Sequence, residues 1–425
     1  MMRRVEAVTS LRGTVRVPGD KSASHRALML SALAAGESTI EGLSPGLDVA
    51  ATSAIMVQLG ATRRDEAGVV HVAGPPDGLR ASTDVLQCGN SGTTIRLVSG
   101  IVSSVEGTHH LEGDASLSRR PMDRIAIPLG RMGAAVTGAG PRVTPPLEIH
   151  GSRSLRAIDF HVPSPSAQVK SAILLAGLRA DADTVVHESV RTRATTEDML
   201  RRAGVGVVST DVARGRRVVL SPGRPRARDW RVPTDPSQAA FFCVLGLIHA
   251  DADIEVVDVD DAPERVGFLH VLARMGADIA VTPGDSGVTL RARSSALHAT
   301  EIVAAEIPSV DEAPILTVAA AAATGVSAFR DMGELRLKES DRFEGSVALA
   351  RLLGCRVWAE GDDYFVEGLG DAARFAPFHI NAGLDHRIVM SSAVAGAAGR
   401  GCDIDGSDTV SSSYPGFFED LGRLR

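Results

Sequence analysis

The residues of this chain that could carry acid–base chemistry are marked by a contrast between its two kinds of cation. The 425 residues include 45 Lys plus Arg, and only Lys21, Lys170 and Lys338 are lysines. Arg keeps its charge permanently, whereas Lys is a compact ammonium group that can be tuned to give up a proton. Lys21 and Lys338 lie in polar motifs and are candidates for such a role. For Lys170, a site residue and a solvated helix residue both remain possible.

Carboxylates that could exchange protons with these lysines occur in two segments. The segment ELRLKESDR (residues 334–342) is crowded with charge and contains Glu334, Glu339 and Arg342. On an ordinary helix, such residues would form surface ion pairs. Asp311 precedes the apolar run APILTVAAAAA, where an acid either caps a helix or acts as a base at the rim of a site. Both segments are therefore candidates for proton transfer.

Small and polar residues mark the start of six Ala-rich helical patterns. These open with GDKSASHRA, GNSGTTIRL, PSPSAQVKS, PTDPSQAAFF, PSVDEAPIL and LDHRIVMSS. Any one of them, taken alone, indicates only helix capping. A helix N-terminus also presents unpaired N–H groups and a partial positive charge. If all six face one cleft that also holds Lys and Arg, the cleft would bind several phosphates or carboxylates.

The elements that must position these residues form a repeat. A helix ending in an apolar residue and Gly, followed by a β-type run, recurs every 71 to 78 residues. Its glycines are Gly60, Gly133, Gly204, Gly276 and Gly354, with a sixth expected at Gly422. Each unit reads as helix, strand, helix and two strands, with the Gly as the helix C-terminal cap.

Six units divide most simply into two domains of three units each. Because the sixth unit lacks its last strands, residues 3–17 are expected to complete it. The predicted domains are then residues 1–19 with 233–425, and residues 20–232. The expected fold is α/β, with an active site in the interdomain cleft. An open solenoid is the alternative.

Composition narrows the function classes. The net charge is −7 with acids and bases interspersed, which argues against nucleic acid as the main partner. The sequence shows no signal peptide and no apolar run long enough to span a membrane. The four cysteines are scattered without a CxxC pair, so a reducing cytoplasm is expected.

The ordered motifs PGDKSASHRALML, CGNSGTTIRL, GDASLSRRPMDR, SAQVKSAILLAGL, ELRLKESDR and DHRIVM resemble those of the enolpyruvyl transferase family, in particular its EPSP synthases. The resemblance covers nearly the whole chain. It implies an inverse α/β barrel-like fold with three βα units per domain. It also implies that the enolpyruvyl group of phosphoenolpyruvate is transferred to the 5-hydroxyl of shikimate 3-phosphate, with release of phosphate. It implies a cytoplasmic monomer without metal or organic cofactor.

The resemblance also implies the role of individual residues. Lys21, Asp311 and Glu339 would be catalytic: a cation between the substrates, the base for the 5-hydroxyl and the acid–base group at the methylene carbon. The implied ligands of shikimate 3-phosphate are Lys21, Ser22, Arg26, Ser166, Gln168, Arg193, Asp311, Glu334 and Lys338. The implied ligands of phosphoenolpyruvate are Lys21, Asn90, Gly92, Arg120, Gln168, Arg342, His386 and Arg387.

Some positions depart from the family pattern. Where many members have Ser-Arg-Asp-His-Thr-Glu, this chain has TRATTE (residues 192–197), with Ala194 and Thr195 in place of Asp and His. Ser412 stands where some members have Lys. These changes bear on affinity more than on reaction type. Gly92 is Ala in herbicide-tolerant members, so glyphosate is expected to compete with phosphoenolpyruvate here.

Three other functions remain as alternatives. The sister enzyme acting on UDP-N-acetylglucosamine uses a loop Cys, which the corresponding segment EGDASLSRRP lacks. A relative acting on another phosphorylated cyclitol is kept open by the TRATTE segment. A binding protein without activity would not need Lys21, Asp311 and Glu339 together.

Overall fold

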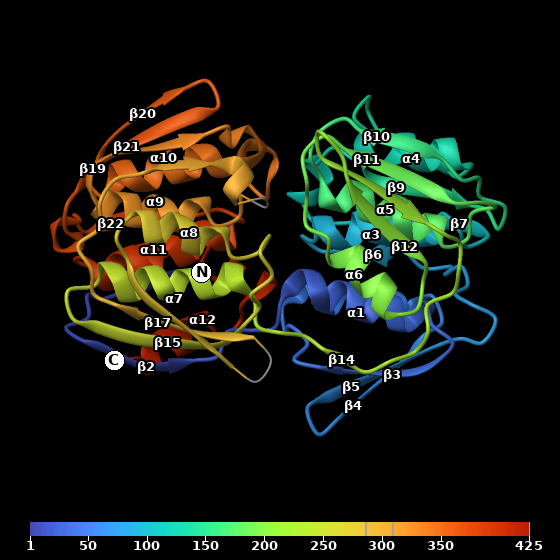
Figure 1. Ribbon diagram of the computed structural model, residues 1–425, viewed down its shortest axis with the longest axis horizontal. Coiled ribbons are helices and arrows are strands. Elements are labelled where there is room, and N and C mark those ends of the chain that lie inside the picture. The colour runs from blue at the N-terminus through green and yellow to red at the C-terminus, as the bar shows by residue number, and fades with distance from the viewer. Residues whose placement is uncertain (285–286, 308–309, 425) are drawn as a thin grey trace. The chain divides into compact units, whose positions relative to one another are not determined.

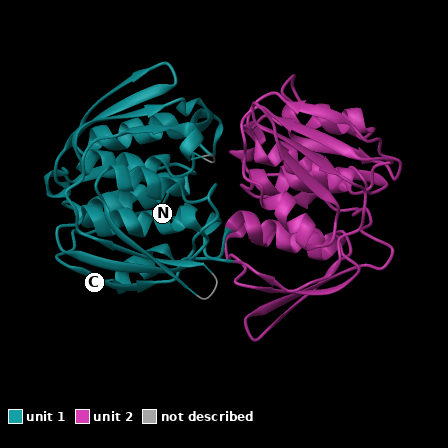
Figure 2. Ribbon diagram, viewed as in Figure 1, with its two compact units in different colours: residues 1–20, 233–425 teal, residues 21–232 magenta. Residues whose placement is uncertain are grey.

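The computed structural model of the protein describes residues 1–284, 287–307 and 310–424. The chain divides into two compact units (Figure 2). Unit 1 comprises Met1–Asp20 and Pro233–Arg425, and unit 2 comprises Lys21–Val232. Each unit has its own hydrophobic core.

In unit 2, three sheets surround a core of helices (Figure 1). The sheets have the orders β14 (Trp230–Arg231), β3 (Gly36–Glu41), β5 (Val69–Gly74), β4 (Thr62–Glu66); β6 (Leu86–Gln87), β7 (Gly107–Glu112), β9 (Thr144–Gly151), β8 (Ala135–Ala139); and β10 (Asp159–Val162), β11 (Thr184–Glu188), β13 (Arg216–Leu220), β12 (Val207–Asp211). The helices are α1 (Lys21–Leu33), α2 (Leu47–Gln58), α3 (Gly92–Val102), α4 (Asp123–Met132), α5 (Ala167–Gly177) and α6 (Thr195–Arg202), with a 3-10 turn η1 (Leu117–Arg119).

Unit 1 repeats this plan. Its sheets have the orders β16 (Asp278–Pro283), β17 (Val288–Arg293), β15 (Ala252–Val259), β2 (Leu11–Val15); β18 (Glu301–Val303), β19 (Thr324–Arg330), β21 (Asp363–Leu369), β20 (Arg356–Glu360); and β1 (Met2–Val5), β23 (Cys402–Asp405), β22 (Phe378–Asn381). The helices are α7 (Pro236–Ile248), α8 (Gly267–Arg274), α9 (Ala313–Ala322), α10 (Arg342–Leu352), α11 (His386–Ala398) and α12 (Phe417–Arg423). The 3-10 turns are η2 (Ala304–Glu306), η3 (Met332–Leu337), η4 (Ala372–Arg374) and η5 (Ser407–Ser412).

The Ala-rich helices form the centre of each unit because they have almost no polar face. All residues of α7 and α9 are buried, and both helices contact α11. Small side chains allow close approach: a Cβ on Gly100 of α3 would lie 2.3 Å from the carbonyl oxygen of Ala172 on α5. This arrangement of helices inside and sheets outside confirms the predicted α/β fold of repeated βα units.

The prediction that residues 3–17 complete the sixth unit is only half right. β1 pairs with β23 of the sixth unit, but β2 pairs in parallel with β15 of the fourth. β14 correspondingly pairs in parallel with β3 of the first unit. The first and fourth units follow the two points where the chain passes between units, and each takes its outer parallel strand, β14 or β2, from a distant part of the sequence. The unit to which such a strand belongs is therefore set by its hydrogen-bonded partner and not by its neighbours in the sequence.

The cap glycines follow the prediction with one exception. Gly60, Gly133, Gly204 and Gly276 adopt the positive φ that a side chain would strain, and so does Gly354. The expectation at Gly422 is wrong, because that residue lies inside α12. In the described part of the chain, no helix combines the length and apolar character needed to cross a membrane.

Candidate functional site

Lys21 is the first residue of α1 and is held by a carboxylate of the neighbouring helix. Its Nζ lies 2.5 Å from Oδ2 of Asp48, the second residue of α2. The Lys21 side chain keeps 17% of its surface exposed, while that of Asp48 keeps 7%. The structure therefore fixes the ammonium group and leaves part of it open to a ligand. Sequence reasoning missed Asp48, which carries no motif of its own.

A neutral histidine supports this helix one turn further on. Burial lowers the pKa of His25 well below its ordinary value, and the charges of Lys21 and Arg26 lower it further. His25 Nδ1 lies 2.7 Å from Oγ1 of Thr52, which lies 2.8 Å from Oγ1 of Thr94. This buried polar chain ties α1 to α2 and α3 without adding positive charge.

Two arginines gather at the start of α1. Arg26 is 5% exposed and donates hydrogen bonds to Thr196 Oγ1 at 2.6 Å and to Ser171 Oγ at 2.9 Å. Arg193 Nη1 donates to Ser22 Oγ at 3.3 Å. The predicted ligands Ser22, Arg26 and Arg193 thus lie together, although they come from two distant segments. Forked guanidinium groups so placed suit a phosphate or a carboxylate.

A second cationic cluster surrounds the start of α3. Arg120 Nη2 donates to Asn90 Oδ1 at 2.6 Å, and Asn90 Nδ2 donates to Asp114 Oδ2 at 2.6 Å. A Cβ added at Gly92 would lie 2.9 Å from Nη1 of both Arg120 and Arg96. Glycine therefore leaves room for two guanidinium groups at the helix N-terminus, a site suited to an anion.

Gln168 connects this cluster to α5. Its Oε1 accepts from Arg96 Nη1 at 2.6 Å, and its Nε2 donates to Thr93 Oγ1 at 2.9 Å. Ser166 is the N-cap of α5, with Oγ accepting from Val169 N at 3.4 Å. Sequence reasoning missed Arg96, although its place in GNSGTTIRL one turn after Gly92 was an available signal.

Lys170 is neither a solvated helix residue nor an open site residue. Its side chain is fully buried, and its Nζ lies 2.9 Å from Glu188 Oε2 and 2.7 Å from Glu197 Oε1. Thr192 also hydrogen-bonds Glu188. Residues 192–197 are thus anchored to the core of unit 2 through Lys170. Ala194 is buried before α6, and Thr195, its first residue, is half-buried.

In unit 1 the charged cluster is built on Arg342, the first residue of α10. Its Nε and Nη2 donate to the two oxygens of Asp385 at 2.9 and 3.1 Å. Its Nη1 donates to Asp311 Oδ1 at 3.0 Å, and its Nη2 to Glu339 Oε2 at 2.5 Å. Burial lowers the pKa of Arg342, but the three carboxylates outweigh it and the pKa is raised. Burial also raises the pKa of Asp385, yet Arg342 brings it below its ordinary value. The buried ion pair of Arg342 and Asp385 is therefore in contact with two partly exposed carboxylates, those of Asp311 and Glu339.

Those two carboxylates are the predicted acid–base residues. Asp311 and Glu339 retain 20% and 18% of their side-chain surface. Lys338 Nζ lies 3.6 Å and Arg387 Nη2 lies 4.0 Å from Asp311. Glu334 is half-buried in η3. Asp311 thus faces three cations, Arg342, Lys338 and Arg387.

α11 opens with the remaining predicted ligands. His386 and Arg387 are 2% and 5% exposed. Asp385 caps the helix by accepting from Arg387 N at 2.9 Å, and Arg387 Nη1 donates to Ser237 O at 3.4 Å. Asp385 was missed as a functional residue, since in DHR it reads as an ordinary cap.

The crossing segments, where the chain passes between the two units near Asp20 and near Pro233, are hydrogen-bonded to each other within unit 1. Asp20 N donates to Pro233 O at 2.7 Å, and Asp235 N donates to Pro18 O at 2.9 Å. Arg265 is 8% exposed and pairs with the carboxylates of both Asp20 and Asp235. The residue preceding Lys21 is therefore fixed by a buried ion pair, and no sequence motif marks Arg265.

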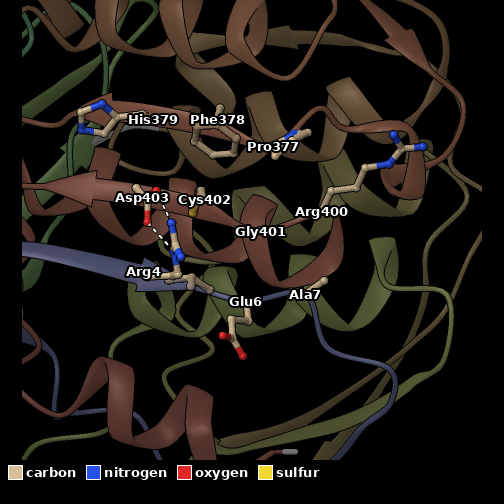
Figure 3. Close-up of a pocket in the computed structure, with 11 residues that line it drawn as sticks. Arg4, Glu6, Ala7, Pro377, Phe378, His379, Arg400, Gly401, Cys402 and Asp403 are labelled. Carbon is tan, nitrogen blue, oxygen red and sulfur yellow. Dashed lines mark hydrogen bonds and ion pairs between the residues drawn. The ribbon is translucent and has the colours of Figure 1, made fainter.

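A surface hollow of unit 1 lies away from these residues. It is lined by ends of β1, β22 and β23, with Arg4 paired to Asp403 across two strands (Figure 3). Pro377 and Gly401 line it at the starts of β22 and β23, whereas His386 follows the other end of β22. None of the predicted site residues contributes to this hollow.

Comparison with known proteins identifies the fold and the family. The enolpyruvyl transferase NikO from Streptomyces tendae has a TM-score of 0.79 over 100% of this chain and 97% of its own, at 19% identity, which shows the shared fold. An EPSP synthase structure from Acinetobacter baumannii has a TM-score of 0.86 and 36% identity over 100% of this chain and 98% of its own.

Sequence comparison is more specific. The family model of EPSP synthase (3-phosphoshikimate 1-carboxyvinyltransferase) matches residues 5–421. The enzyme of that name from Gloeobacter violaceus is 44% identical over 98% of this chain and 97% of its own length. That from Synechococcus sp. (strain RCC307) is 42% identical over 98% and 97%. The chain belongs to the EPSP synthase family.

Proposed function

We propose that this protein transfers the enolpyruvyl group of phosphoenolpyruvate to the 5-hydroxyl of shikimate 3-phosphate, a step of aromatic amino acid biosynthesis. The full-length family match supports the reaction. The observation that supports assigning the reaction to individual residues is the cluster of charged side chains around Arg342. There a buried ion pair with Asp385 supports two partly open carboxylates, Asp311 and Glu339, beside Lys338.

In the proposed reaction, Asp311 takes the proton of the 5-hydroxyl while the hydroxyl oxygen forms a bond to C2 of phosphoenolpyruvate. Glu339, which must be in its protonated form when the substrates are bound, delivers its proton to C3, giving a tetrahedral intermediate. The C2–O bond to phosphate then breaks, C3 returns a proton to Glu339, and the enol ether forms. Lys21 contacts both substrates and can move a proton between them, which Arg could not do. Glu339 is therefore protonated again at the end of the cycle. Asp311 ends the cycle protonated and must lose that proton before the next turnover.

Binding of the substrates is assigned to the cationic clusters. Ser22, Arg26 and Arg193 would hold the 3-phosphate side together with Ser166 and Gln168. Asn90, Gly92 and Arg120 would hold the phosphate of phosphoenolpyruvate, with Arg96 as an added cation. From unit 1, Glu334 and Lys338 would contact the shikimate ring, and Arg342, His386 and Arg387 would bind phosphoenolpyruvate. Permanent guanidinium charge suits both phosphate and carboxylate groups.

The test is phosphate release from phosphoenolpyruvate by the purified protein, with and without shikimate 3-phosphate. Release that requires both substrates is the expected result. An Asp311→Asn variant should lose release while still binding shikimate 3-phosphate, because the amide keeps the shape but cannot accept the proton. Release by wild-type protein without the acceptor would contradict the proposal.

A second candidate acceptor is another phosphorylated cyclitol. The observation that favours it is the TRATTE segment, where buried Ala194 and half-buried Thr195 replace the Asp and His of many family members. Folded protein that is inactive with shikimate 3-phosphate but active with a different phosphorylated cyclitol would support this candidate.

We further propose that the protein works as a cytoplasmic monomer. Cys88, Cys243, Cys355 and Cys402 are all free and buried, as suits a reducing compartment. Size-exclusion chromatography with light scattering tests the monomer, and a mass of about twice 44.4 kDa would contradict it.

A further inference from the structure

Three potential metal ligands meet on the outer face of one sheet in unit 2. Asp159 and His161 lie two residues apart on β10, so their side chains leave the same face of the strand. His187 of β11 is the register partner of His161. Asp159 and His161 are exposed and His187 is half-buried. The proposed reaction uses none of these residues.

The side chains already converge. The rings of His161 and His187 stack with centroids 4.1 Å apart and planes 5° apart. His187 Nε2 lies 3.0 Å from Asp159 Oδ1. One ligand atom from each residue lies within 4.8 Å of the other two, and this is the single group of that kind among the described residues.

We propose that Asp159, His161 and His187 form a binding site for a divalent cation of the zinc class. Two imidazoles and one carboxylate, with water in the fourth position, are a common tetrahedral set for Zn²⁺. Bonds of about 2.0–2.2 Å require ligand atoms about 3.4 Å apart. The His187–Asp159 pair is already at 3.0 Å, and the ligand atoms of all three residues lie within 4.8 Å of one another, so side-chain rotation has to close at most about 1.4 Å between ligand atoms. Imidazole ligands favour Zn²⁺, Ni²⁺ and Cu²⁺ over Mg²⁺ and Ca²⁺.

The strand that carries two of the three ligands is anchored in the core of unit 2. Phe160 and Val162 alternate with the ligands and are buried in the core of unit 2. β10 is the edge strand of its sheet and pairs only with β11 within that sheet. A bound ion would therefore cross-link the edge strand to its neighbour a few residues before Ser166. We expect the consequence to be stabilisation of this edge.

One neighbouring charge opposes the ion and provides an internal test. Arg217 on β13 is the register partner of His187 on its other side. Cross-strand partners in register leave the same face of the sheet, so the Arg217 side chain starts next to that of His187 on the face of the proposed site. Replacing Arg217 with Gln should strengthen metal binding by removing this repulsion. If the two histidines serve only the structure of the sheet, the substitution should not change metal binding.

Isothermal titration calorimetry of tag-free, metal-stripped full-length protein with ZnCl₂ and NiCl₂ tests the site. Wild type should bind one equivalent of either ion and should show no binding of MgCl₂. His161→Asn and His187→Asn should each weaken binding about tenfold or more. Arg217→Gln should strengthen it by a few-fold. Zn²⁺ should raise the unfolding temperature of wild type and leave that of His161→Asn unchanged.

The matched control is His150→Asn. His150 is also exposed and pairs with a carboxylate, Glu148, at 2.9 Å, but belongs to another sheet. This variant should bind Zn²⁺ as wild type does. Absence of Zn²⁺ and Ni²⁺ binding by wild type would overturn the proposal. So would binding unchanged by His161→Asn and His187→Asn, or binding lost in His150→Asn. Circular dichroism without metal checks that each variant is folded.

Discussion

Replacing Asp260 with Asn should stabilise the protein at neutral pH. Asp260 lies where the crossing segments are pinned: its N–H donates to Thr234 O at 3.1 Å, and its Oδ1 accepts from Ala262 N at 3.1 Å. Burial raises its pKa to about 6, and the nearby charge of Asp20 adds to the effect. Asn keeps the accepting oxygen and removes the charge.

The size of the gain follows from proton linkage. The carboxyl of Asp260 has a higher pKa in the folded chain than in the unfolded chain, so its neutral form favours folding. This contribution is complete at pH values below about 4 and is lost as pH rises through about 6. The ionised group therefore costs up to about 3 kcal/mol at pH 8 and about half of that at pH 5. The Asp260→Asn variant escapes this cost.

The assay is urea unfolding at pH 5 and pH 8 in a Trp230→Phe background. Trp358 is then the remaining tryptophan and reports on unit 1, which also contains Asp260. The stabilising effect of Asp260→Asn should grow by about 1 to 2 kcal/mol between the two pH values. Asp261→Asn is the matched control, because Asp261 is exposed and adjacent and should give no such trend.

A stabilisation that is equal at both pH values would refute the linkage argument. A destabilisation by Asp260→Asn at pH 8 would refute it more strongly. It would mean that attraction to Arg265, which opposes the other charges, outweighs burial.

Two further substitutions test the site, and a third tests the buried ion pairs of Lys170. Lys21→Arg should abolish most phosphate release while the chain stays folded, because Asp48 can still pair with the guanidinium; near-normal turnover would contradict the role of Lys21. Gly92→Ala should raise the KM for phosphoenolpyruvate about fivefold, because displacing the two guanidinium groups beside the new methyl group costs about 1 kcal/mol, the lower end of the range for overpacking, and should weaken glyphosate inhibition at least as much; unchanged KM and inhibition would contradict the crowding at Gly92. Lys170→Met should lower the free energy of unfolding by about 3–5 kcal/mol, because it leaves Glu188 and Glu197 buried without a cation; a loss below about 1 kcal/mol in urea unfolding would contradict this reasoning.

The repeat and the helix starts could be read from the sequence because they depend on local signals. Cap glycines such as Gly60 and Gly133 are required wherever a helix ends in a left-handed residue, whatever surrounds it. Buried helices such as α7 and α9 show as apolar, Ala-rich runs bounded by polar residues. The candidate residues Lys21, Asp311 and Glu339 stand within such boundaries and in recognisable motifs.

Other features could not be read, because they depend on partners far away in the sequence. The leading strand β14 has only two residues, too few for a pattern, and β2 lies closer in sequence to β1 than to its partner β15. Arg265 has no motif, yet it pairs with residues from both crossing segments. Asp385 reads as a helix cap, and only the fold brings it behind Arg342.

The sequence by itself determined the six-fold repeat, the helix starts and the residue types available for acid–base and anion chemistry. These follow from local propensity and from the few side chains that can carry such chemistry. The tertiary structure alone decided which strands complete each sheet, that Lys170 is buried with two carboxylates, and that Asp385 forms the buried ion pair with Arg342. Those outcomes depend on burial and on contacts between residues tens to hundreds of positions apart, and no local pattern encodes them.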